Sequence, residues 1–135
     1  MLGRAFAERF PATHEHLSRI ATEFVRSDAA WQNIGNSCRQ ALLEFCTECC
    51  AVLDIQLPSE TKRGDVKTIA RCLVQKLYSN GRFGDALTTL VASTWDYAQT
   101  LTHRPATTPD EALRLYLWTG LVINEIANLA DAASK

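Results

Sequence analysis

The tetrapeptide Thr108–Glu111 carries three agreeing signals for the start of an α-helix. Thr108 can act as the N-cap, Pro109 suits the first helical position, and Glu111 can complete a capping box with Thr108. A long apolar segment follows, and the preceding stretch, Asp96–Arg104, is typical of a helix that ends on a polar pair. This pattern predicts two long helices joined by a short loop.

Apolar residues recur at helical spacing along most of the rest of the chain, and strand signals are essentially absent. We expect a short helix near Leu2–Phe10 that stops at Pro11, followed by helices at about 13–26 and 29–55. Further helices should follow Asp65 and cover about 85–102 and 109 onward. Caps and turns are expected at Ser27 or Asp28, at Asn80-Gly81 and at Gly84. The predicted fold is all-α: a single domain over 1–135, an antiparallel bundle of four main helices plus a short N-terminal helix.

The bulk composition is that of an ordinary globular domain. The chain has 135 residues, of which 47% are hydrophobic and 21% charged, and its net charge is −1. This charge gives no overall attraction to nucleic acid or to an anionic membrane, although a local basic patch remains compatible with it. No apolar run reaches the roughly 20 residues of a membrane span, and no apolar signal core is visible at the N-terminus. We expect a cytoplasmic protein without membrane contact.

Five cysteines are present, four of them in the helix expected at 29–55. Cys46 and Cys49 have the spacing of a redox or zinc motif, but no turn or second ligand pair accompanies them. At 100° per residue, Cys38, Cys46 and Cys49 fall on the same stripe as large apolar residues. We therefore expect them to pack in the core, with no metal, no cofactor and no structural disulfide.

Asp96, Gln99 and His103 share the face of the penultimate helix that lies opposite its apolar side. An acid, an amide and a histidine in line could bind a phosphate-bearing ligand or transfer a proton. The alternative is a solvated polar face on which His103 caps the helix C-terminus, where the helix dipole favours a cation. The spacing favours this second interpretation.

A local basic strip lies between residues 60 and 82 and comprises Lys62, Arg63, Lys67, Arg71, Lys76 and Arg82. Such a strip could contact RNA phosphates, with Lys67 and Arg71 as the main candidates and Tyr78 as the one stacking side chain. Because exposed aromatic residues do not alternate with the basic ones, a solvated helix face is the favoured interpretation.

The last helix has an unusual polar face, because Leu117 and Leu121 lie in the middle of the sector that should face water. A helix that is apolar on all sides is usually covered on all sides. Either the N-terminal helix covers these leucines, or they form a dimer or partner interface. The sequence supports the two interpretations about equally.

Two segments give the chain a resemblance to the HEPN superfamily, small all-helical domains of bacterial abortive-infection and toxin–antitoxin systems. Ser37–Glu44 resembles the opening "small-Arg-x-Ala-Leu-Glu" helix, and Gln99–His103 with Asp110–Ala112 resembles the passage before the final helix. The resemblance covers about residues 29–130. It implies the fold, a tendency to dimerise and contact with RNA or nucleotide. Active members carry an arginine that is separated from the histidine by four to six residues, but the corresponding positions 96–98 here hold Asp-Tyr-Ala.

The leading hypothesis is a HEPN-like module of a bacterial defence or regulatory system. It would act without catalysis, by homodimerisation and by binding RNA or a partner protein from a defence operon. One alternative is an active metal-independent RNase that uses His103 with Arg104 or with a basic residue of another chain. Another is a helical immunity or adaptor protein with no nucleic-acid role.

Overall fold

The computed structural model describes residues 4–24, 31–78 and 81–133, with 81, 82 and 133 described by backbone alone. These residues form helices and no strand, which confirms the all-α prediction. The helices are α1 (Arg4–Arg9), α2 (Pro11–Phe24), α4 (Ile34–Leu53), α5 (Val66–Leu77), α6 (Gly81–Thr102) and α7 (Pro109–Ala133). No helix in the described part of the chain is both long and apolar enough to cross a bilayer.

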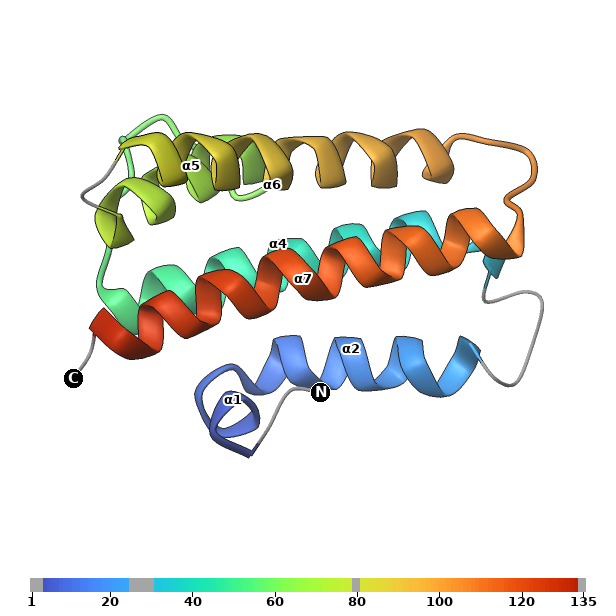
Figure 1. Cartoon of the computed structure of the whole chain (residues 1–135), viewed down its shortest axis with the longest axis horizontal. Helices are drawn as coiled ribbons and strands as arrows, with labels where there is room; N and C mark the ends of the chain where they lie inside the picture. The colour runs from blue at the N-terminus through green and yellow to red at the C-terminus, as the bar shows by residue number, and fades with distance from the viewer. Residues whose placement is uncertain (1–3, 25–30, 79–80, 134–135) are drawn as a thin grey trace.

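The long helices lie roughly parallel to one axis of the molecule (Figure 1). Along the chain, α2, α4, α6 and α7 alternate in direction, so α4 and α7 run the same way side by side. Helix α4 contacts α2, α5, α6 and α7 and is therefore the centre of the bundle. The predicted antiparallel alternation holds for these four long helices, whereas α5 runs in the same direction as α4.

The core forms around α4, where the apolar stripe meets the neighbouring helices. Phe45 of α4 packs its ring 5.2 Å from that of Phe10, which joins α1 to α2. Cys38, Cys46 and Cys49 are all buried on this side of α4, as their spacing predicted. The remaining large buried side chains include Ile34, Leu42, Leu73, Leu101, Leu115 and Ile123.

The starts of α2 and α4 differ from those expected from the sequence. Helix α2 begins at Pro11 instead of Thr13, because Pro11 fits the first turn and so starts this helix as well as ending the preceding segment. Helix α4 begins at Ile34, after a non-helical Asn33 (φ −100°, ψ 6°) interrupts the helical residues at 31–32. The proposed caps at Ser27 and Asp28 lie outside the described residues.

The turn predicted at Gly84 is wrong, since α6 already begins at Gly81 and Gly84 lies within its first turn. A Cβ at Gly84 would lie 3.4 Å from Val74 Cγ1 and 3.6 Å from Tyr78 Cβ. This glycine therefore sits at the tight contact between the end of α5 and the start of α6. Asn80, the other half of the expected turn signal, is outside the described residues.

Gly35 marks a very close approach between α4 and α6. A Cβ placed there would lie 2.6 Å from the Thr102 backbone nitrogen and 2.7 Å from the Ala98 carbonyl oxygen. Only a residue without a side chain lets the two backbones come this close. The contact fixes the C-terminal end of α6, and therefore the loop that leads to α7.

Candidate functional site

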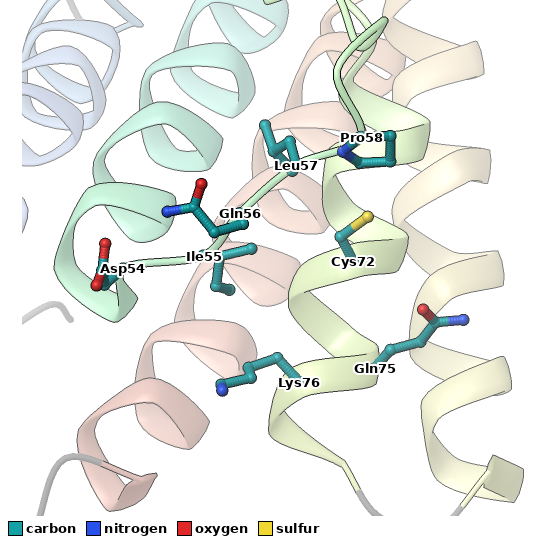
Figure 2. Close-up of a pocket in the computed structure, with 8 residues that line it drawn as sticks. All are labelled: Asp54, Ile55, Gln56, Leu57, Pro58, Cys72, Gln75 and Lys76. Atoms are coloured by element: carbon teal, nitrogen blue, oxygen red, sulfur yellow. The ribbon is translucent and has the colours of Figure 1, made fainter.

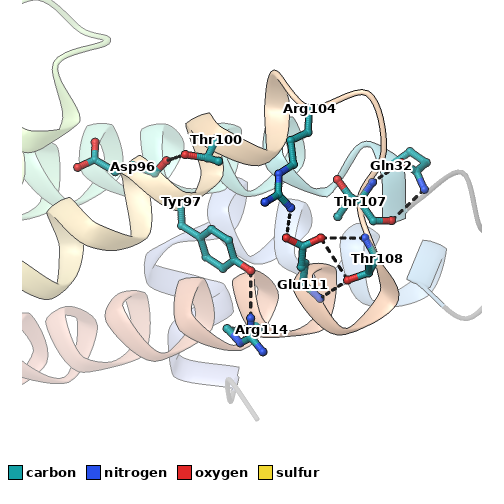
Figure 3. A network of polar contacts seen from close by, with 9 residues as sticks. All are labelled: Gln32, Asp96, Tyr97, Thr100, Arg104, Thr107, Thr108, Glu111 and Arg114. Atoms are coloured by element: carbon teal, nitrogen blue, oxygen red, sulfur yellow. Dashed lines mark hydrogen bonds and ion pairs between the residues drawn. The ribbon is translucent and has the colours of Figure 1, made fainter.

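The loop between α6 and α7 is held by the capping box that the sequence predicts. The Thr108 N–H donates to Glu111 Oε1 at 3.1 Å, and the Glu111 N–H donates to Thr108 Oγ1 at 3.2 Å. Figure 3 shows these bonds at the start of α7. Two of the first N–H groups of the helix region thereby gain partners.

Arg104 is bound to this cap. Its guanidinium donates to the Glu111 carboxylate and forms an ion pair with it (Figure 3). The pKa of Glu111 is lowered, chiefly by the bond from the Thr108 backbone N–H and further by Arg104. Arg104 therefore supports the start of α7.

The structure does not bring His103 and Arg104 together as a catalytic pair. His103 is exposed at the end of α6, and no hydrogen bond or ion pair joins its side chain to another described residue. Its backbone N–H donates to the Gln99 carbonyl at 3.3 Å, which continues the helix. The geometry of this corner is that of a helix terminus.

A second anchor of the loop comes from Gln32, far away in the sequence. Its amide donates to the Thr107 carbonyl at 3.0 Å and accepts from the Thr107 N–H at 2.8 Å (Figure 3). Thr107 is buried, so the two bonds satisfy backbone groups that water does not readily reach. The two residues are 75 positions apart, and no local sequence signal indicates the pairing.

The three residues of the polar face, Asp96, Gln99 and His103, do not form one cluster. Asp96 Oδ1 lies 2.7 Å from Lys67 Nζ, so this pair links α6 to α5. Gln99 is half-buried and His103 exposed. No described hydrogen bond joins the three side chains to one another.

The basic strip is partly neutralised by acidic neighbours. Lys67 pairs with Asp96, and Arg63 Nη2 lies 3.6 Å from Glu44 Oε1. Arg71 is exposed. Tyr78, the candidate for stacking on a base, is half-buried and packs against the core. The side chain of Arg82 is not among those described.

The outward side of α7 carries the most pronounced apolar surface of the described residues. Leu113, Leu117 and Leu121 are 47%, 52% and 52% exposed, and Trp118 beside them is 37% exposed. Their spacing of four residues places the leucines on one face. We call these four residues the α7 leucine face. The sequence had indicated Leu117 and Leu121, whereas Leu113 and Trp118 emerge only from the structure.

An aromatic pair borders this face. The ring of Tyr97 on α6 lies 5.2 Å from that of Trp118, and Arg114 donates to the Tyr97 hydroxyl at 3.4 Å (Figure 3). These contacts hold the flank of the face against α6. A rigid aromatic and arginine border is a common feature of protein-binding surfaces.

The described N-terminal helices do not cover the two central leucines. Helices α1 and α2 contact each other, and α2 packs mainly on α4. The end of α2 reaches α7 through Phe24, whose ring lies 5.8 Å from that of Tyr116. In the view of Figure 1, no described element crosses the front of α7. Of the two interpretations of Leu117 and Leu121, coverage by the N-terminal helix is therefore wrong.

The surface of the described residues has two hollows that could hold a small ligand. An open one of about 640 Å³ is lined by Asp54, the segment 55–58, and Cys72, Gln75 and Lys76 of α5 (Figure 2). A smaller one, of about 200 Å³, lies between α2 and α4 with His16 and Arg19 in its lining. No described hydrogen bond or ion pair joins the lining side chains of either. Neither hollow assembles a catalytic group with a partner.

No cluster of three or more metal-binding side chains occurs within residues 4–24, 31–78 and 81–133. No family model matches the chain, and neither a curated protein nor a solved structure is detectably similar to it.

Proposed function

We propose that this protein is a non-catalytic helical interaction module that self-associates through the α7 leucine face. The observation that carries the proposal is the half-exposed row Leu113, Leu117 and Leu121 in the N-terminal half of α7. Burying apolar surface yields about 25 cal/mol per Å², so such a row gains free energy when another surface covers it. Contiguous exposed apolar patches of this kind mark interaction sites.

The composition of the surface supports protein binding. Leucines at every fourth position form the row that an amphipathic helix presents to a groove or to another helix. Trp118 and Tyr97 add aromatic area at its edge, and Arg114 adds a charged group beside them. Tryptophan, tyrosine and arginine are the residues that most often dominate binding energy in interfaces.

RNA is the less favoured ligand. The chain has a net charge of −1, and Lys67 and Arg63 of the basic strip already have acidic partners. Binding to nucleic acid depends on cations that are free to neutralise phosphates. The proposal therefore places RNA contact by Lys67 and Arg71 second to protein association.

The arrangement of side chains around His103 does not favour catalysis. An RNase centred on His103 would need an arginine beside it, but Arg104 is bound to Glu111. The resemblance to HEPN domains then contributes the fold and the tendency to dimerise, in a defence or regulatory role. It does not contribute nuclease activity.

The experiment compares the mass in solution of the wild type, a Leu117→Asp/Leu121→Asp variant and a Phe83→Asp control by light scattering. Phe83 is 62% exposed at the start of α6, outside the α7 leucine face, so it controls for the loss of an exposed apolar side chain. The wild type and the control should self-associate and the double variant should be monomeric, with equal helix content by circular dichroism. Association that persists in the folded double variant would contradict the proposal.

A further inference from the structure

We infer that the surface that covers the α7 leucine face is the same face of a second copy, paired antiparallel about a two-fold axis. In this arrangement Arg114 of each copy meets Glu125 of the other. The inference rests on the proposed function and adds the geometry of the association. The evidence for it is the order of the charged residues along the outward side of α7.

Arg114 and Glu125 are both exposed and stand on the same flank of the leucine row. Their separation corresponds to about three helical turns, so the two side chains leave the helix in directions that differ by only about 20° around its axis. Trp118 lies between them on that flank, whereas Leu117 and Leu121 form the centre. The face therefore has a cationic end and an anionic end, with apolar side chains in between.

A two-fold axis that passes between two antiparallel α7 helices near residue 119 brings the cationic end of each face against the anionic end of the other. It places Leu117 of one copy opposite Leu121 of the other, and it keeps each flank on the same side of the seam. Arg114 then lies level with Glu125 of the second copy, twice in one dimer. At the outer ends, the exposed Asp110 faces the neutral Asn128, so no like charges meet. An isologous contact of this kind closes at two copies.

A parallel pairing of the same faces fits less well. It would place Arg114 level with Arg114 and Glu125 level with Glu125 of the other copy. Like charges brought together in a contact oppose association, whereas complementary ones set its orientation. The order of charges along α7 therefore selects the antiparallel register.

Charge reversal tests the register by sedimentation equilibrium. Arg114→Glu alone, or Glu125→Arg alone, creates two repulsive contacts in each dimer and should weaken self-association by about fivefold or more. An equimolar mixture of these two variants restores both attractive contacts in the mixed dimer. The Arg114→Glu/Glu125→Arg double variant should also associate approximately as the wild type does.

Tyr97→Phe is the matched control, because it removes the hydroxyl that Arg114 contacts and leaves every charge in place. It should associate like the wild type. If both single reversals associate as the wild type does, while Leu117→Asp/Leu121→Asp abolishes association, the antiparallel register is wrong and the proposed function stands. If, in addition, the mixture of Arg114→Glu and Glu125→Arg associates more tightly than the wild type, the pairing is parallel. A wild type that remains monomeric overturns both.

Discussion

The Glu48 carboxylate on α4 caps α2 by accepting two hydrogen bonds from Thr13, at 2.7 Å from the backbone N–H and 2.6 Å from the hydroxyl. It also accepts from the Ala12 N–H at 3.0 Å. Thr13 is completely buried, so its polar groups depend on this carboxylate. A side chain of the central helix thus does what an N-cap residue normally does within a helix.

Glu48→Ala should therefore lower the free energy of unfolding by about 1–2 kcal/mol, because it leaves buried donors at the start of α2 without an acceptor. Urea denaturation followed by circular dichroism measures the change. Glu60→Ala, in the exposed loop before α5, is the control and should lie within about 0.5 kcal/mol of the wild type. Equal effects of the two substitutions would contradict a capping role for Glu48.

Gly35→Ala should destabilise the protein by about 1–3 kcal/mol, because the new Cβ would meet backbone atoms of Thr102 and Ala98 at 2.6 and 2.7 Å. Neither atom can move without shifting α6. Gly64→Ala is the matched control, since a Cβ there meets nothing within 4 Å and this glycine has no positive φ. Thermal unfolding of both variants tests the contact. An undiminished melting temperature for Gly35→Ala would show that α4 and α6 are not packed this closely.

Arg104→Gln should raise the pKa of Glu111 toward its ordinary value of 4.5, while the bond from the Thr108 N–H still holds it below that value. A carboxyl with a lowered pKa in the folded state contributes stability that is present above about pH 4.5. This contribution is lost as the pH falls through the folded-state pKa. An NMR titration of the Glu111 carboxyl carbon measures the change, with Lys62→Gln as the control. An unchanged titration in Arg104→Gln would contradict the ion pair.

The cysteines should differ in their reactivity toward a thiol reagent at pH 8. Burial raises the pKa of Cys38 and Cys49 to about 12, and it raises that of Cys46 as well. Because the thiolate is the reactive form, these three should be labelled only as the protein unfolds. The half-buried Cys72 should react first, as measured by alkylation and peptide mass spectrometry. Rapid labelling of Cys46 or Cys49 would instead favour the redox or metal interpretation of their spacing.

Features encoded within one helical turn were predictable from the sequence. The Thr108–Glu111 capping box is one example, because both of its partners lie three residues apart. The caps from Gln32 and Glu48 could not be predicted in this way. They join residues 75 and 35 positions apart, and only the packing of the helices brings them together.

The candidate site was predictable in part. Leu117 and Leu121 stood out because they interrupt a polar sector, but their environment depends on where α1 and α2 pack. That packing is determined by long-range contacts on α4. The same reasoning explains why Arg104, beside His103 in the sequence, binds Glu111 across the loop.

The most direct test of the central claim is sedimentation equilibrium of the wild-type protein over a range of concentrations. The account predicts a monomer–dimer equilibrium in which the mass rises from the 15.0 kDa of one chain toward twice that value. It also predicts that Leu117→Asp/Leu121→Asp remains at the mass of one chain while keeping its helix content. A wild type that stays at one chain's mass at every concentration would contradict self-association through α7.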